Sequence, residues 1–558
     1  MTRRDAIALL ATPPLLAAAP PWDVLIRGGT IYDGTGAPGV RADVALKGDR
    51  VAAIGDFSAA SARATIDAEG CAVAPGFINV LSWAADELIH DGRGLSDLKQ
   101  GVTLEIFGEG TSLGPLNPTM RRERLRAQPR GKRYPIPWVT NAGALAWLAR
   151  RGVALNVASF VGAATVRIHE LGYANRAPTK PELARMQELV RREMRLGALG
   201  VGSALIYAPG AYAQTPELAA LAAAAAPFGG VYISHLRSEG DRLLEALDEL
   251  LEIARIAQLP AEIYHLKAAG RDNWPKLDTV LNRLDAARAS GLRVAANMYT
   301  YTAASTGLDA AMPPWVQEGG FNAWRRRLRD PKVRSRVAAE MRDPLAAWEN
   351  LLRAAGPDQT LLLGFANPAL RPYIGKTLAE AARLRDTTAE DAAIDLVIED
   401  GSRVSVAYFL MSEANVRRQV ALPWMTFGSD ARAIAAEGDQ LQAATHPRTY
   451  GNFARLLGKY VRDEQALPLE SAIHQLTGLP ATRLGLAGRG RLVPGAFGDV
   501  VVFDPRSIRD TATFERPHSY AEGVHHVFVN GRHTLKNGEF TGQTAGRFVR
   551  GPGYRPTP

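Results

Sequence analysis

Eight short apolar segments, each followed by a stretch of helical periodicity, constrain the fold of this chain more than any other feature. They cover residues 73–81, 103–107, 154–160, 199–205, 232–235, 262–265, 294–299 and 425–428. Buried strands that alternate with helices are typical of parallel α/β folds, and eight such units close a (β/α)8 barrel. The sequence therefore predicts an α/β fold built on a TIM-like barrel, with polar functional groups at the carboxyl ends of its strands.

The two ends of the chain have a different pattern. Residues 22–75 read as short alternating strands with glycine turns, residues 499–503 and 524–529 are strand-like, and Asn530-Gly531 is a hairpin signal. We expect residues 21–75 and 488–558 to pair into one small β-sandwich domain beside a barrel of residues 76–487. The stretch at about 302–422 reads as a long, mostly helical insertion before the last barrel strand.

The first twenty residues are typical of an export signal. Arg3 and Arg4 precede an apolar stretch over residues 6–19 that is too short to span a bilayer as a helix. Paired arginines point to the twin-arginine route, so we expect residues 1–20 to direct the protein to the periplasm or outside the cell. The alternative is a cytoplasmic protein with a frayed N-terminal tail.

Positive charge is concentrated in residues 121–133. The formal net charge is +9, and this segment contributes six of those charges from seven basic residues and Glu123. The simplest interpretation is a solvated loop, and the alternatives are a lid over an anionic ligand or a contact with an anionic membrane surface. The run has no interleaved aromatic residues and no nucleic-acid motif lies nearby, so we expect no nucleic-acid partner.

Polar residues occupy the ends of four predicted barrel strands. Glu109 follows the second strand, His235 and His265 end the fifth and sixth, and Asp430 follows the eighth. Cys71 is the single cysteine, which excludes a Cys-based zinc cluster and leaves His, Asp and Glu as ligands. Two imidazoles and one carboxylate leave a fourth position open, as in catalytic zinc sites. The spacing alone does not decide between a metal site and histidines with a structural role.

Ordered motifs continue through the chain after residue 20. They are Ala74-Pro75-Gly76-Phe77-Ile78, Gly101-Val102-Thr103, Gly197-Ala198-Leu199-Gly200, the run YISHLRSE at 232–239, Tyr299-Thr300-Tyr301-Thr302-Ala303, Gly428-Ser429-Asp430, His446-Pro447-Arg448, GKYVR at 458–462 and DVVVFD at 499–504. With these motifs the chain resembles the D-aminoacylase, or N-acyl-D-amino-acid deacylase, branch of the amidohydrolase superfamily over nearly its whole length.

The resemblance implies a set of roles. It implies a TIM-like barrel with a β-sandwich built from both chain ends, His235 and His265 as metal ligands and Asp430 as catalytic acid and base. Lys267, Tyr299 and Arg448 match positions that hold the substrate carboxylate, a role that suits a lysine, a hydroxyl donor and an arginine. Ser305 lies on the same loop as Tyr299 and is expected to assist them. Arg237 and Glu239 are expected to pair near His235.

The sequence departs from the family at two places. The family carries a His-x-His pair after the first strand, where this chain has Leu81-Ser82-Trp83, and a bridging Cys after the second, where this chain has Gly108-Glu109-Gly110. Leu and Trp side chains are not zinc ligands, so we expect no binuclear site of the usual kind. Ser82 and Trp83 would shape the pocket instead, and the alternative for Trp83 is simple core packing.

Two interpretations of the altered site remain. In the first, which we favour because His235, His265 and Asp430 persist together, one zinc ion is held by Glu109 and the two histidines, with Glu105 as a deeper substitute for Glu109. The chain would then be a hydrolase that cleaves the amide bond of N-acyl amino acids and releases a carboxylic acid and a free amino acid. Another amide, such as a dipeptide, cyclic imide or lipid amide, is the alternative substrate. In the second interpretation the chain is an inactive relative that binds carboxylates. The acyl chain, the D or L preference and the oligomeric state stay open.

Overall fold

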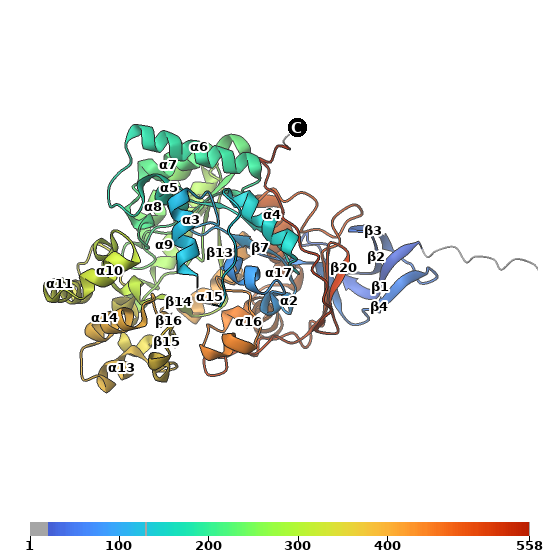
Figure 1. The fold of residues 1–558 in the computed structure, drawn as a ribbon. Coiled ribbons are helices and arrows are strands. Elements are labelled where there is room, and N and C mark those ends of the chain that lie inside the picture. Colours follow the sequence, from blue (N-terminus) through green and yellow to red (C-terminus); the bar gives the residue numbers. More distant parts are fainter. Residues whose placement is uncertain (1–20, 129–130, 557–558) are drawn as a thin grey trace, which may run out of the picture.

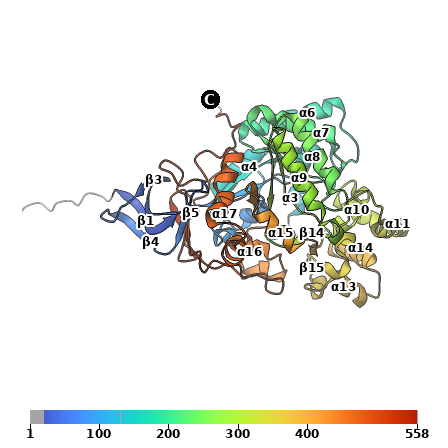
Figure 2. The same cartoon turned by 180° about the vertical axis from the view of Figure 1, so that it is seen from behind.

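The computed structural model describes residues 21–128 and 131–556, so the predicted export signal at 1–20 lies outside the described residues. Figures 1 and 2 show a large helical body with a smaller sheet domain at one end. In the part of the chain that the structure describes, no helix combines the length and the apolar character needed to cross a membrane.

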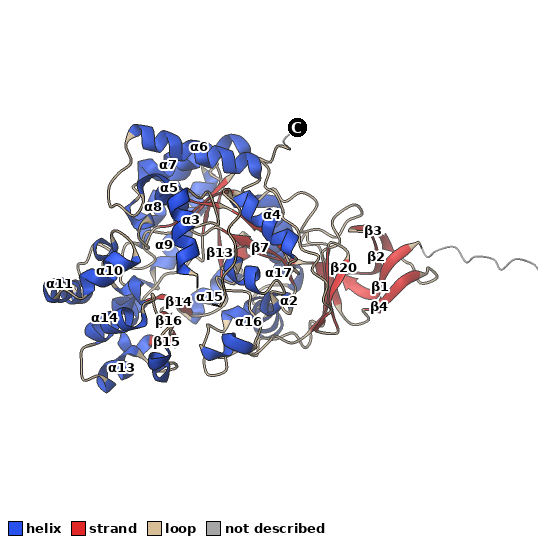
Figure 3. Ribbon diagram, viewed as in Figure 1, coloured by secondary structure: helices blue, strands red, loops and turns tan. Residues whose placement is uncertain are grey.

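The body is built on a barrel of parallel strands, visible in red inside the helices of Figure 3. One sheet has the order β6-β7-β8 and the other the order β17-β13-β12-β11-β10-β9. Backbone hydrogen bonds join the two sheets: the Leu199 N–H donates to Ser159 O at 3.1 Å, and the Asp430 N–H donates to Leu81 O at 2.9 Å. The strands are β6 (Phe77–Asn79), β7 (Val102–Phe107), β8 (Asn156–Ser159), β9 (Val161–Gly162), β10 (Gly200–Ala204), β11 (Val231–His235), β12 (Ala261–Ile263), β13 (Val294–Met298) and β17 (Met425–Phe427).

Helices follow these strands and cover the barrel, as the TIM-like pattern requires. They include α4 (Asn141–Arg151), α5 (Ala163–Leu171), α6 (Lys180–Leu196), α7 (Thr215–Ala225), α8 (Leu243–Ala257) and α9 (Lys276–Ala289). The start of α6 shows how local sequence fixes such an element. Thr179 and Glu182 form a reciprocal capping box, and Gly197 ends the helix at φ 109°. The predicted α/β barrel is confirmed.

Strands from both chain ends form one nine-stranded sheet. Its order is β21-β20-β19-β18-β5-β1-β2-β3, and β4 pairs with β1. The antiparallel pair of β18 with β5 joins the C-terminal strands to the N-terminal ones. The strands are β1 (Trp22–Ile31), β2 (Val40–Lys47), β3 (Arg50–Gly55), β4 (Ala62–Asp67), β5 (Ala72–Pro75), β18 (Val500–Phe503), β19 (Val524–Val529), β20 (Arg532–Lys536) and β21 (Glu539–Phe540). This is the small β domain that the sequence predicts, while its limits stay a prediction.

The segment between β13 and β17 contains strands as well as helices. A three-stranded antiparallel sheet has the order β14-β16-β15, from β14 (Ala303–Gly307), β15 (Thr360–Gly364) and β16 (Ser405–Phe409). The helices α10 (Phe321–Leu328), α11 (Pro331–Arg342), α13 (Leu378–Leu384) and α14 (Ala389–Asp400) lie beside it in Figure 1 and share a separate apolar core with it. The sheet positions Ser305 and Thr306 near the barrel.

The basic segment is partly neutralised within the molecule. Residues 118–127 form helix α3 (Pro118–Ala127), in which Arg124 pairs with Asp86 at 2.5 Å. Lys132 pairs with Asp439 at 3.0 Å. Arg130 lies outside the described residues. Contact of residues 121–133 with an anionic membrane surface stays a prediction.

A buried polar network joins the sheet domain to the barrel. Asp499 forms an ion pair with Arg489, and its Oδ1 accepts the backbone N–H of Asn530 at 2.7 Å. The Asn530 side chain donates to Asn156 on barrel strand β8 at 2.8 Å. All four residues are buried. Charged groups removed from water need partners, so this network holds the two parts of the chain in one arrangement.

We therefore predict that Asp499→Ala lowers the free energy of unfolding by ~3–5 kcal/mol, because it leaves the buried Arg489 charge without its partner. Urea denaturation followed by circular dichroism measures this loss. The control is Glu69→Ala, which removes an exposed ion pair with Arg41 on the same sheet and should cost below ~1 kcal/mol. Equal losses in the two variants would contradict the role of Asp499.

Candidate metal centre

Three buried side chains converge at the carboxyl ends of the barrel strands. Glu109 follows β7, His235 ends β11 and His265 follows β12. One ligand atom from each lies within 4.8 Å of the other two, and all three residues are buried. The sequence predicted these three residues as ligands, and the structure brings them together.

Two glycines determine the position of Glu109. Gly108 has φ 112° and Gly110 has φ 66°, in a region of backbone conformation that other residues rarely adopt. A Cβ atom on Gly108 would lie 2.6 Å from the carbonyl oxygen of Phe160, and one on Gly110 would lie 2.8 Å from the Cβ of Ala204. The Gly-Glu-Gly sequence therefore lets the chain turn sharply against the neighbouring strands and direct the Glu109 carboxylate into the barrel mouth.

Hydrogen bonds orient the two imidazoles. Nδ1 of His235 lies 2.9 Å from the carbonyl oxygen of Leu236, and Nε2, the other ring nitrogen, lies 3.8 Å from Oε2 of Glu239. Nε2 of His265 lies 3.0 Å from Oε1 of Glu109. Nδ1 of His265 lies 2.9 Å from Oε1 of Glu239, which also accepts Lys267 at 2.6 Å. A carboxylate behind a histidine is a usual support for a metal ligand, because it fixes the tautomer and the ring.

The charges in this cluster compensate one another. Burial would raise the pKa of Glu109, but the charge of His265 and its hydrogen bond outweigh that effect and lower the pKa. Burial and Lys267 act to lower the pKa of His265, whereas Glu239 and Glu109 raise it, to about 9. Burial lowers the pKa of His235. The two carboxylates therefore favour the protonated form of His265, while Nζ of Lys267, 2.6 Å from its Nδ1, opposes it. A metal ion on Nε2 would take the place of a proton there.

The donor set fits a zinc ion. Ligand atoms of a tetrahedral zinc lie about 3.4 Å apart, given bonds of about 2.0–2.2 Å to nitrogen and oxygen. The observed atoms lie within 4.8 Å of one another, and Nε2 of His265 lies 3.0 Å from Oε1 of Glu109, which is close to that spacing. Two nitrogens and one oxygen leave a fourth position for water or substrate, which is the composition of catalytic zinc sites.

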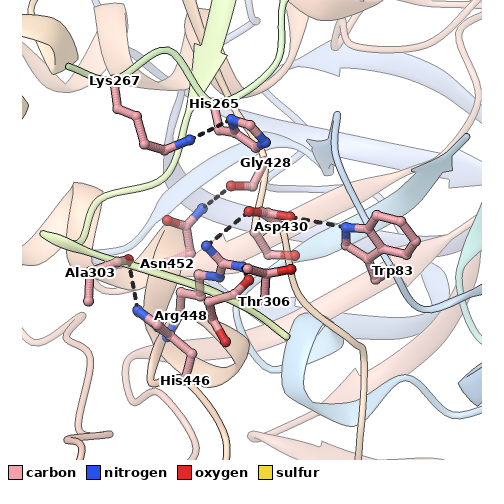
Figure 4. A network of polar contacts seen from close by, with 12 residues as sticks. Trp83, His265, Lys267, Ala303, Thr306, Gly428, Asp430, His446, Arg448 and Asn452 are labelled. Carbon is pink, nitrogen blue, oxygen red and sulfur yellow. Dashed lines mark hydrogen bonds and ion pairs between the residues drawn. The ribbon is translucent and has the colours of Figure 1, made fainter. Parts of the chain in front are cut away.

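Asp430 lies near this cluster: Figure 4 shows it close to His265 and Trp83, and the Trp83 indole that contacts it also contacts Glu109. The Asp430 φ of 48° is unusual for a residue with a side chain and is held by the hydrogen bond to Leu81. Oδ2 lies 2.9 Å from Nη1 of Arg448, and Oδ1 accepts the indole N–H of Trp83 at 3.0 Å. Burial raises the pKa of Asp430 above its usual range, although Arg448 acts against the shift. A raised pKa suits a group that accepts and returns a proton near neutral pH.

The residues that were predicted to bind the substrate carboxylate lie close together. The guanidinium of Arg448 lies 4.4 Å from the ring centroid of Tyr299, and Nζ of Lys267 lies 5.5 Å from it. The Tyr299 hydroxyl and Nε of Arg448 are buried and have no hydrogen-bond partner among the described residues. The Ser305 hydroxyl donates to Val406 at 2.9 Å, and its backbone oxygen accepts from Arg448. Two donors without partners beside the ligands are suited to an incoming carboxylate.

The structure corrects one expected contact. Arg237 pairs with Glu249 at 2.8 Å, so the predicted Arg237–Glu239 pair is wrong. Glu239 contacts His265 and Lys267 instead. Arg237 also donates to the backbone oxygens of Ala211 and Ala213, so its partners differ from those of Glu239.

Glu105, the substitute ligand, lies apart from the three converging groups. The Asn79 side chain donates at 3.0 Å both to Glu105 and to Asp97, which are buried together. Burial raises the pKa values of both acids, so this pair retains a proton more readily than ordinary carboxyls. Sequence reasoning missed this pair, because Asp97 lies outside the predicted strand ends.

Trp83 belongs to the site, although core packing was one expectation for it. Its indole N–H reaches Oε2 of Glu109 at 3.0 Å as well as Oδ1 of Asp430. Its side chain is not packed in the core, since 43% of the residue's surface is exposed. The sequence feature that pointed to this role is the position of Trp83. It lies two residues after Leu81, where the family that the chain resembles carries a histidine.

Comparisons with known proteins agree with this geometry. The profile of the amidohydrolase family matches residues 133–535. A D-aminoacylase of Alcaligenes xylosoxydans is 34% identical over 95% of this chain and 98% of its own length.

Two solved structures give the same result. One is a D-aminoacylase studied for its binuclear metal centre, with one-metal activation and second-metal attenuation. It is 32% identical, has a TM-score of 0.79, and the match covers 95% of this chain and 100% of that one. The other is an N-acyl-D-glutamate deacylase of Bordetella bronchiseptica with zinc and a phosphonate mimic of the tetrahedral intermediate. It is 30% identical, has a TM-score of 0.78, and the match covers 95% and 99% of the two chains. This chain belongs to the amidohydrolase family.

Proposed function

We propose that this protein is a zinc-dependent hydrolase of N-acyl amino acids that works with one metal ion. The observation that carries the proposal is the convergence of Glu109, His235 and His265, with Asp430 joined to Glu109 through the Trp83 indole. The names of the similar proteins support N-acyl-D-amino acids as the substrate class. The absence of a His-x-His pair at Leu81 and Trp83 supports a single ion.

Glu109, His235 and His265 would hold the metal. When bound, zinc polarises an amide carbonyl and lowers the pKa of water. Asp430 would accept a proton from the attacking water and then pass it to the leaving amine, at the carboxylate that Trp83 and Arg448 hold in place. The pKa of Asp430, raised by burial, supports both steps.

Arg448, Tyr299 and Lys267 would hold the carboxylate of the amino-acid half. The partnerless Tyr299 hydroxyl and Arg448 Nε provide two donors for it. Lys267 is engaged by Glu239 and His265 and would contribute mainly its positive charge. Holding the carboxylate fixes the amide relative to Asp430, which lowers the entropic part of the barrier. The Ser305 hydroxyl would have to leave Val406 to take part.

We predict that His235→Ala reduces bound metal well below one ion per chain. The variant removes one of three ligands, and the two that remain form an incomplete site. Elemental analysis of the purified protein measures the content. His525→Ala, an exposed histidine on β19, is the control and should keep the full content. Full metal content in His235→Ala would place the ion elsewhere.

We predict that Asp430→Asn keeps the metal but loses turnover by about 10²–10⁴-fold, because an amide cannot accept the proton. The amide still accepts a hydrogen bond from Trp83, so the local structure should persist. Amine release and metal content are measured on the same preparation. Near-normal turnover would show that another group is the base.

A paired panel of N-acyl-D- and N-acyl-L-amino acids tests the substrate class. We expect amine release from the D-series that depends on added zinc and is lost on chelation. A dipeptide, a cyclic imide and a lipid amide complete the panel, because each is an alternative amide. Amine release from one of these alone would show that the substrate is that other amide. Metal binding without any hydrolysis would favour an inactive relative that binds carboxylates.

A further inference from the structure

The indole N–H of Trp83 lies between two acidic groups of the site. It is 3.0 Å from Oε2 of Glu109 and 3.0 Å from Oδ1 of Asp430. Glu109 is buried, and the Asp430 side chain is only 11% exposed. A single neutral donor is therefore shared by two acids that the mechanism uses in different ways.

The other oxygen of each acid is already engaged. Oε1 of Glu109 faces Nε2 of His265, on the side of the metal ligands. Oδ2 of Asp430 faces Arg448. Since each carboxylate has one oxygen on Trp83 and one on a functional partner, the indole fixes the rotation of both groups. Loss of the N–H would leave both free to turn and would bring two acidic oxygens together without a donor.

The backbone holds Trp83 firmly in this position. Its own N–H donates to Ala431 O at 2.9 Å, and the Ser82 N–H donates to Ile106 O at 2.9 Å. The first contact ties Trp83 to the segment that carries Asp430, and the second ties it to the strand that precedes Glu109. The donor is thus positioned by the same two elements as the acids that it contacts.

We propose that Trp83 is a positioning residue that takes the place of a second cation between Glu109 and Asp430. A carboxylate pair of this kind is commonly bridged by a positive ion, and here an N–H bridges it. The proposal rests on the proposed function, because it assigns Glu109 to the metal and Asp430 to proton transfer. It predicts an effect on metal geometry that can be observed without substrate.

The test compares Trp83→Phe with Trp138→Phe. Phenylalanine keeps an aromatic ring at position 83 and removes the N–H. Trp138 is the matched control, because its buried indole donates to Leu113 O at 2.9 Å without contacting the ligands or Asp430. Thermal unfolding verifies that both variants fold, which the partial exposure of Trp83 favours.

The first measurement uses cobalt(II) as the probe. The metal of the full-length protein is exchanged for cobalt, and its visible absorption is titrated. We expect wild type and Trp138→Phe to share one spectrum, and Trp83→Phe to show an altered spectrum with about 10–100-fold weaker binding, as for other groups that orient ligands. An unchanged spectrum and affinity in Trp83→Phe would overturn the proposal.

The second measurement is kinetic. We expect kcat of Trp83→Phe to fall about 10–100-fold with little change in KM, because Asp430 loses its orientation while the residues around Tyr299 are intact. A change confined to KM would overturn the positioning role. Wild type that binds cobalt but hydrolyses no N-acyl amino acid would overturn the proposed function alone, and the spectra would still decide the role of Trp83. Wild type that binds no cobalt would overturn both.

Discussion

The site depends on the pairing of acidic and basic side chains in the buried mouth of the barrel. Glu109 and Glu239 are buried, Asp430 is mostly buried, and each of these acids lies against a basic group. Uncompensated buried charge would cost several kcal/mol, so this pairing allows the strand ends to carry acids at all. The protonated His265 between Glu109 and Glu239 completes the balance before any cation binds. A divalent metal ion would take the place of that proton among the acids and add one further positive charge.

The fold provides the backbone shapes that this balance needs. Barrel strands end side by side, and sharp turns follow them at Gly108, His265 and Asp430, all with positive φ. Such turns cost energy unless the surroundings hold them, and they occur often at functional sites. The insertion adds a small sheet whose first strand, β14, lies against Arg448. The strand ends and this sheet therefore surround the ligands from different parts of the chain.

Much of the barrel could be predicted from the sequence, because the apolar periodicity indicates which segments are buried. The eight barrel strands follow from that pattern, and the polar residues after them made Glu109, His235 and His265 candidates, while their roles as metal ligands came from the family resemblance. Side-chain contacts that depend on the geometry of a turn could not be predicted from the sequence. For this reason the expected pair of Arg237 and Glu239 was wrong. The strands of the β14-β16-β15 sheet were missed because partners far apart in sequence leave no local mark. The acid pair of Asp97 and Glu105 was missed because mid-strand and helical positions predict only burial.

The replacement of the family's histidine by Trp83 changes what Asp430 can do. A carboxylate bound to a divalent cation is a weaker base, because the cation stabilises the charged form. An indole N–H is a neutral donor, so it orients Asp430 and stabilises its charge far less. Burial can then keep the pKa of Asp430 raised, even with Arg448 on its other oxygen. Under the proposed role of Trp83, its N–H bridges Asp430 to Glu109 and supplies orientation, while burial supplies the basicity of Asp430.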